Sequence, residues 1–195
     1  NPIFAVTAIG TIGVGIGANT VIFTLLYGLL LRSLPVKDPE QLVRLNIAST
    51  SSSNTTTAVP YQMLLEIRGQ QRSFTDISAW MFRRVTMDTH DGVPRMLDAE
   101  LVSGNAFEIL GMNAYLGRLL TREDDVRGGP SYGWSVVLSY PFWRDNFGAD
   151  PSIVGRQIKL SNTLATVVGV APRQFRGVRP GSEIPFYLPL QFAPV

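Results

Sequence analysis

The 195-residue chain carries 17 basic and 15 acidic side chains, yet none of them lies in its first 31 residues. The other 164 residues hold every charge, at roughly 20%, close to the usual density of a soluble domain. A single soluble globular domain is therefore excluded for the whole chain, and a net charge of +2 lacks the clustered excess of a nucleic-acid binder.

The uncharged amino-terminal segment predicts a transmembrane helix over residues 1–32. A span needs about 20 mostly apolar residues to cross about 30 Å of hydrocarbon. A cleaved secretory signal is one alternative, but it would start with basic residues and have a shorter apolar region. The charges that follow, Arg32, Lys37 and Arg44, leave the orientation undecided, because large domains cross membranes largely regardless of charge.

The glycines of this segment allow two interpretations. Gly13, Gly15 and Ala18 match the dinucleotide-binding fingerprint, with Asp38 twenty residues after Ala18. A nucleotide-binding helix lies at a protein surface and needs charged residues on its solvated face, and residues 19–31 carry none. The fingerprint is therefore disfavoured.

We favour a helix-packing face instead. Gly13 and Gly17 form a small-xxx-small pair, with Ala18 beside it, that lets another helix approach closely in lipid. Asn19 lies next to that face and is a candidate for an interhelical hydrogen bond. The alternative for Asn19 is an amide satisfied by its own backbone turn.

The charged part of the chain alternates short strands and short helices. Pro60 fits the first turn of a helix over 60–69 whose core residues would be Tyr61, Leu64 and Leu65. Asp91-Gly92 is a strong hairpin dipeptide. Further expectations are a strand at 42–47, a mobile loop at 49–57, a helical turn at 73–77, a hairpin of 78–89 with 95–103, a helix at 106–110 capped by Asn105 and ended by Gly111, a strand at 135–138, a helix at 140–147 ended by Gly148, and a hairpin of 158–160 with 165–170.

These elements predict an α+β fold: one amino-terminal transmembrane helix, then an extracytoplasmic mixed α/β core domain over residues 33–195, as one unit or as two subdomains. The acidic run Glu123-Asp124-Asp125 lacks the alternating spacing of a calcium loop, so we interpret it as a solvated loop. His90 is the sole histidine and lies beside a predicted turn. We therefore expect no catalytic residue, no metal site and no cofactor.

Arg173, Arg176 and Arg179 form the most concentrated basic feature of the chain. They are candidates for contact with lipid headgroups or a partner. The alternative, which we prefer, is a solvated or salt-bridged loop with Phe175 inserted into the domain.

Several segments resemble MacB/FtsX-like ABC transporter permeases, in particular the duplicated permeases of acidobacteria. Residues 15–23 and 29–35 resemble the first transmembrane helix and its exit. Segments of the periplasmic core domain are matched, in order, by residues 102–111, 116–118, 137–143, 147–148, 150–151, 153–155, 167–172, 175–177 and 184–190. Gly111, Gly117, Gly148 and Gly169 lie within these segments, where we expect helices to end or strands to turn.

The resemblance implies a permease subunit in the bacterial inner membrane, with residues 33–195 on the periplasmic side. It also implies a separate cytoplasmic ABC ATPase, other permease helices or a second permease half, and a periplasmic adaptor as partners. ATP-driven motion would reach the periplasmic domain and drive export or extraction of substrate. The sequence shows no second apolar span, so we expect a fragment of a longer permease.

Two other classes stay open at this point. One is a single-span membrane-anchored binding module that captures a partner outside the cell. The other is a membrane-anchored enzyme, which would need a cleft with perturbed ionisable groups. The substrate, and the choice between efflux, lipoprotein release and signalling, do not follow from the sequence.

Overall fold

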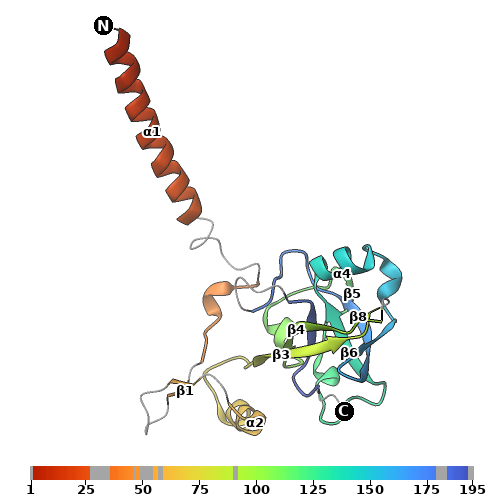
Figure 1. Ribbon diagram of the computed structural model, residues 1–195. Coiled ribbons are helices and arrows are strands. Elements are labelled where there is room, and N and C mark those ends of the chain that lie inside the picture. Colours follow the sequence, from red (N-terminus) through yellow and green to blue (C-terminus); the bar gives the residue numbers. More distant parts are fainter. Residues whose placement is uncertain are drawn as a thin grey trace. The chain divides into compact units, whose positions relative to one another are not determined.

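The computed structural model describes residues 2–26, 36–45, 47–48, 55–56, 59–89, 92–178 and 184–192. The chain divides into two compact units, Asn1–Leu34 and Pro35–Val195. Helix α1 (Pro2–Leu26) belongs to the first unit, and the strands and remaining helices belong to the second (Figure 1). This is the predicted α+β fold, an apolar amino-terminal helix followed by a mixed domain.

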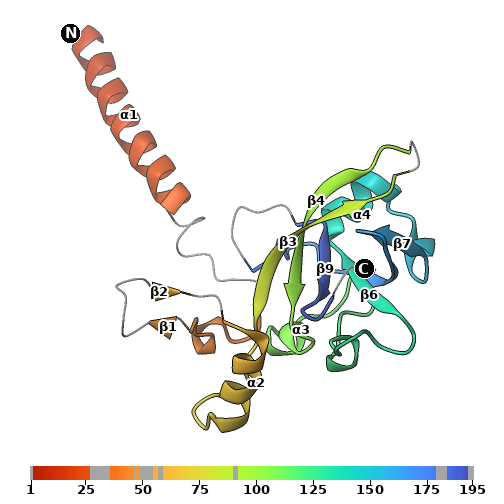
Figure 2. The ribbon, with the colours of Figure 1, turned by 60° about the horizontal axis from the view of Figure 1, so that its bottom comes forward.

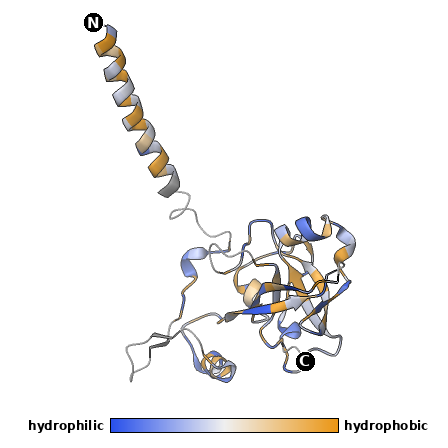
Figure 3. Ribbon diagram, in the orientation of Figure 1, coloured by the Kyte–Doolittle hydropathy of each residue, from blue (hydrophilic) through white to orange (hydrophobic). Residues whose placement is uncertain are grey.

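Helix α1 has the length and hydropathy of a membrane span over Pro2–Thr24. Figure 3 shows it almost entirely in orange and white. The hydroxyl groups of its threonines are paired within the helix. Those of Thr7, Thr11, Thr20 and Thr24 each donate a hydrogen bond to the carbonyl four residues earlier. Intrahelical bonding of this kind suits a helix in hydrocarbon, where an unpaired polar group is costly.

The second unit is built on a seven-stranded sheet that closes on itself. Its order is β5-β8-β6-β9-β4-β3-β7, and β7 also pairs with β8, which completes a ring. We call this closed sheet the barrel. Closure leaves little unpaired edge. The strands are β3 (Trp80–Met87), β4 (Arg95–Val102), β5 (Leu116–Gly117), β6 (Trp134–Leu138), β7 (Gln157–Leu160), β8 (Thr163–Val170) and β9 (Phe186–Pro189). Figure 2 shows β4, β9 and β6 side by side.

The sheet has a core on each of its faces. Side chains alternate across a strand, so in β6 Val136 and Leu138 belong to one cluster and Val137 to the other. The first cluster also contains Phe186 and Leu188 of β9, whereas Tyr187 between them belongs to the second. Burial on both faces accounts for the near-continuous apolar sequence of β6 and β9.

The second unit also contains three short helices, α2 (Tyr61–Gln70), α3 (Ala106–Ile109) and α4 (Tyr140–Phe147). Helix α4 begins where the Ser139 hydroxyl accepts a hydrogen bond from Phe142 N and ends at Gly148 in the left-handed region. Single 3₁₀ turns lie at Pro39–Gln41, Arg122–Asp124 and Pro151–Ile153. Two short strands, β1 (Ile47–Ala48) and β2 (Thr55–Thr56), pair outside the main sheet.

Both predicted hairpins are confirmed. β3 and β4 pair antiparallel from Trp80 opposite Val102 to Met87 opposite Arg95, while His90 and Asp91 of the predicted turn lie outside the described residues. β7 and β8 are joined through Ser161 and Asn162, with φ of 47° and 68°. Two successive positive φ values give the turn the twist that matches a two-residue hairpin.

Some local expectations are wrong. Of the strand predicted at 42–47, residues 42–45 form no strand and their Val43 and Leu45 are exposed, whereas Ile47 belongs to β1. Residues 73–77 bend without forming a helical turn. In the tract at 49–57, Thr55 and Thr56 form β2, and the other residues lie outside the described part.

Two packing expectations also fail. Leu64 of α2 is buried as predicted, but Leu65 is 40% exposed. Gly169 lies within β8 instead of at a turn, where β6 shifts register between Val136 and Val137. A Cβ at Gly169 would collide with the backbone of Arg118, so close approach of two chain segments accounts for this glycine.

Candidate functional site

The predicted helix-packing residues of α1 are only partly on one face. At about 100° per residue, Gly13 and Gly17 lie about 40° apart on the helix surface. Thr20 and Thr24 continue the same stripe, one and two turns further on. A Cβ added at Gly13 or Gly17 would meet no atom within 4 Å. The stripe therefore presents bare backbone toward its surroundings.

The other two candidates point elsewhere. Ala18 lies about 100° and Asn19 about 160° around the helix from Gly17. Neither residue therefore lies on the stripe that Gly13 and Gly17 form. Both stay candidates for helix contacts, but only with a different neighbour from the one that would pack on Gly13 and Gly17.

The segment that follows the apolar unit is attached to both ends of α3. At the carboxyl end, Lys37 N donates to Leu110 O at 3.0 Å. The Lys37 side chain packs over Gly111, whose φ of +61° ends the helix. Further along this segment, the Arg44 guanidinium lies 5.6 Å from the centre of the Trp80 ring at the start of β3.

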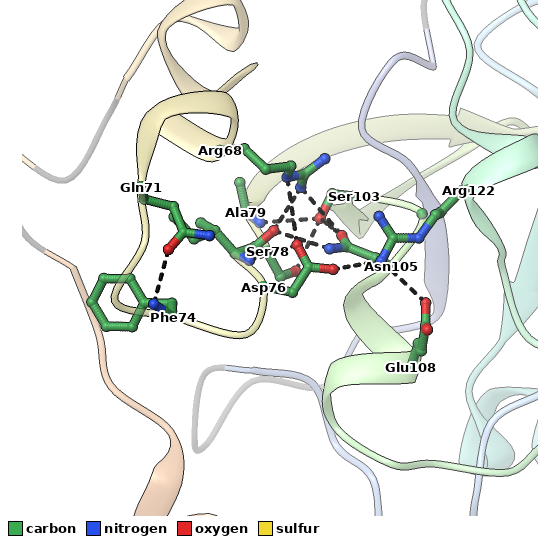
Figure 4. Close-up of polar contacts among 12 residues, drawn as sticks. Arg68, Gln71, Phe74, Asp76, Ser78, Ala79, Ser103, Asn105, Glu108 and Arg122 are labelled. Carbon is green, nitrogen blue, oxygen red and sulfur yellow. Dashed lines mark hydrogen bonds and ion pairs between the residues drawn. The ribbon is translucent and has the colours of Figure 1, made fainter. Parts of the chain in front are cut away.

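At the amino end of α3, helix α2 is attached through Arg68 (Figure 4). Its Nη2 donates to Ile77 O at 2.6 Å and to Asn105 Oδ1 at 3.3 Å. The Asn105 amide in turn donates to Ile77 O and accepts from the Ser103 hydroxyl. Asn105 precedes α3 as predicted, but its side chain caps no backbone N–H there, because this buried network occupies it.

An ion-pair cluster completes this contact. Arg122 binds Asp76, which precedes β3, and Glu108 of α3, as Figure 4 shows. Burial tends to raise the pKa of Asp76, but hydrogen bonds from Asn105 and Arg122 outweigh it and lower that pKa. Asp76 therefore stays ionised and holds Arg122.

We name Lys37, Arg68, Asp76, Asn105 and Arg122 the α3 junction. It fastens residues 36–79, the stretch of chain between α1 and β3, to a helix that packs on the barrel through Ala106 and Phe107. Its bonds are hydrogen bonds and ion pairs that hold elements in position. The junction therefore fixes α2 and the segment before β3 against α3.

The interpretation of the acidic run Glu123-Asp124-Asp125 as a solvated loop is wrong, because Asp124 is buried. Asp124 is fully buried and accepts two hydrogen bonds from Arg118, at 2.6 and 2.9 Å. It also accepts from Thr121 N, Tyr132 and Ser135. Burial raises its pKa, but these donors, Arg118 first, outweigh burial and hold the pKa at about 2. The spacing Thr121-x-x-Asp124 is a capping box and was the available sequence signal.

Glu100 of β4 is the second fully buried carboxyl. Its oxygens accept from Val178 N at 3.2 Å, and Gly177 leaves room for them. Burial raises the pKa of Glu100 to about 7, with only the Val178 N–H lowering it. Beside it, the buried Tyr187 hydroxyl has no hydrogen-bond partner among the described residues, and burial raises its pKa.

The two described arginines of the basic loop, Arg173 and Arg176, have different surroundings. Arg173 lies 4.9 Å from the ring centres of both Tyr115 and Tyr140 and donates to the Tyr115 hydroxyl at 2.8 Å. Arg176 is exposed, and Arg179 lies outside the described residues. Phe175 is buried in the domain, as predicted.

No cluster of three or more His, Cys, Asp or Glu side chains suited to a metal ion occurs within the ranges that the structure describes. His90, the sole histidine, falls outside them.

A family model described as the MacB-like periplasmic core domain matches residues 5–194. The chain belongs to this family. The resemblance drawn from the sequence motifs is therefore confirmed. A search of curated proteins gives no match.

Among solved structures, the MacB-like fold recurs in the periplasmic region of MacB from Actinobacillus actinomycetemcomitans. The TM-score is 0.54 at 16% identity, over 69% of this chain and 56% of that one. The extracellular domain of the noncanonic ABC-type transporter YknZ from Gram-positive bacteria gives 0.41 at 16% identity, over 58% and 53%. The chain thus spans about half the length of the solved chains it matches.

As a MacB-like periplasmic core domain, the chain is part of a permease component of ABC transporters. The α3 junction could not be predicted from the sequence, because its residues are scattered along the chain from Lys37 to Arg122. Only Asn105 carried a local signal, and that signal predicted a helix cap.

Proposed function

We propose that the chain is the first membrane helix and periplasmic core domain of a MacB-type ABC transporter permease. In this proposal α1 crosses the bacterial inner membrane within residues 1–32, and residues 33–195 lie on the periplasmic side. A cytoplasmic ATPase hydrolyses ATP, and the domain transmits the resulting motion to export or extract substrate. Other permease helices or a second permease half contact α1, and a periplasmic adaptor contacts the domain.

Family membership and the apolar α1 support the membrane part of this proposal. The α3 junction is the observation that carries the transmitting role. A displaced membrane helix pulls on residues 36–79 first, because they follow it in the chain. Lys37, Arg68 and Asp76 pass that displacement to α3, which is packed against the barrel.

The double variant Arg68→Ala/Arg122→Ala in the full-length permease, assembled with its ATPase, tests this role. A spin label at Arg127→Cys, an exposed position, reports the separation of two copies of the domain. The chain has no native cysteine, so labelling is specific within it. We expect the unmodified junction to show a change in label separation between the ATP-free and vanadate-trapped states.

In the double variant we expect ATP hydrolysis to continue while the change in label separation is lost. Lys159→Ala is the matched control, because it removes an exposed ion pair with Asp88 outside the junction. A double variant that moves as the control does would contradict a transmitting role for the junction.

A further inference from the structure

A groove on the barrel follows the edge of β4. Its volume is about 790 Å³. Four consecutive residues of β4 line it, Arg95, Met96, Leu97 and Asp98. Successive side chains of a strand point to opposite faces, so a cavity touched by all four must run along the strand's edge.

That edge is unpaired where it borders the groove. β3 pairs with the whole of β4, but on the other side β9 pairs only from Ala99 opposite Phe186 onward. No strand partner for residues 95–98 exists on that side in the described part of the chain. The groove therefore continues the position of β9 along β4. Figure 2 shows β9 beside β4.

The opposite wall and floor are apolar with a polar rim. Helix α4 contributes Phe142, Asp145 and Asn146, and Phe175 and Ile184 are also among the lining residues. Phe142, Phe175 and Ile184 are each at most 9% exposed, so they form a firm floor. Met96 beside them is 67% exposed and offers apolar surface to an incoming chain.

Basic side chains outnumber acidic ones in the lining of the groove. Its carboxylates are already neutralised, Asp98 by Arg84 at 3.5 Å and Asp145 by Arg144 at 2.6 Å. Its arginines Arg95 and Arg176 are exposed and have no carboxylate partner within the described ranges. Two guanidinium groups that pair with no described carboxylate, beside a strand edge, favour a ligand that carries carboxylates.

We propose that this groove is a docking site for an extended, acidic peptide segment of a partner protein, which adds as a strand to residues 95–98 of β4. The exposed backbone groups of the edge supply hydrogen bonds, the apolar floor takes alternate side chains, and Arg95 and Arg176 bind carboxylates. Strand addition to a free sheet edge is an established mode of peptide recognition. At about 3.3 Å per residue, the edge accommodates a segment of four or five residues.

The test uses the full chain in detergent micelles and a fluorescein-labelled peptide of sequence Thr-Val-Glu-Val-Glu-Val-Thr. We expect saturable binding by fluorescence anisotropy, and hydrogen exchange slowed at residues 95–98. A peptide with lysine in place of glutamate should bind at least tenfold more weakly. A peptide with N-methylated valines, which cannot donate backbone hydrogen bonds, should also lose binding.

Arg95→Glu and Arg176→Glu should each weaken binding about tenfold or more. Arg127→Glu is the matched control, with the same change of charge at an exposed position away from the groove lining. Equal binding by the Arg95→Glu and Arg127→Glu variants would overturn the proposal. The proposal would also be overturned if the peptide slowed hydrogen exchange at residues other than 95–98. Peptide binding only after residues 179–183 are replaced by a Gly/Ser linker would overturn it too, because the groove would then bind the chain's own segment.

Discussion

Two buried carboxyl groups of the barrel differ in what surrounds them. Asp124 accepts hydrogen bonds from Arg118 and from neighbouring hydroxyl and backbone groups, and its pKa is about 2. Glu100 accepts from one backbone N–H, and its pKa is about 7. The number and charge of the donors thus decide whether a buried carboxyl favours its ionised form. The two groups make opposite contributions to stability as pH changes.

Asp124→Asn should destabilise the barrel by about 2 kcal/mol at pH 7, because it removes a buried charge from its guanidinium partner. The folded pKa of Asp124 lies below the unfolded 3.8, so its contribution is present above about pH 4 and disappears toward pH 2. Asp145→Asn, at a fully exposed carboxylate, should leave the stability nearly unchanged. Thermal unfolding followed by near-ultraviolet circular dichroism checks both; equal losses would refute the buried role.

Glu100→Gln should remove a pH dependence of stability whose sign is opposite to that of Asp124. The folded pKa of about 7 lies above the usual glutamate value of 4.5, so ionisation of Glu100 costs stability as pH rises between these values. At pH 8 the variant should be more stable than the unmodified chain by up to about 3 kcal/mol. The same unfolding measurement at pH 5 and pH 8 applies, with exposed Glu66→Gln as the control. An equal difference at both pH values would contradict the assignment.

At the scale of elements, helix α1 places residues that are adjacent in sequence on different faces. Gly17 lies on the stripe with Gly13, Thr20 and Thr24, whereas Ala18 lies about 100° away. A helix packed closely on that stripe would tolerate a large side chain at position 18 but not at position 17.

Gly17→Leu should therefore weaken assembly of the full-length permease, and Ala18→Leu should not. A leucine on the stripe blocks backbone approach, at a cost of about 1 kcal/mol, or roughly a fivefold fall in the assembled fraction. Chemical cross-linking in native membranes gives that fraction. Equal loss for both variants would place the packing face elsewhere.

Elements made of local contacts were predictable. Asp91-Gly92 and the alternation around it gave the β3–β4 hairpin, and Ser139 to Gly148 carries both caps of α4. Strand β9 was not predicted, because its four residues are all buried and show no alternation of apolar and polar side chains. Its partners β4 and β6 lie far away in sequence, so no local pattern reports them.

At the scale of the whole molecule, closure of the sheet could not be predicted. The ring depends on the single pairing of Met87 with Leu160 and on β9 between β4 and β6, all long-range contacts. The family, by contrast, was accessible from an ordered set of short motifs, because each marks a helix end, turn or close contact of the same fold.

A closed sheet with a core on each face should fold without α1. Residues 35–195, expressed alone, should be monomeric and unfold in one cooperative transition, since both core clusters lie within them. Size-exclusion chromatography and calorimetry test this. Aggregation, or a broad transition without a heat-absorption peak, would contradict the independence of this unit.

The central claim is that the chain is the membrane helix and periplasmic core domain of a permease driven by an ABC ATPase. Purification of the complete gene product from native membranes, followed by mass spectrometry and a vanadate-inhibition assay, tests it most directly. The account predicts a co-purified ABC ATPase subunit and vanadate-sensitive ATP hydrolysis. A gene product without further membrane helices, purified without any ATPase, would contradict it and favour a single-span anchored binding module.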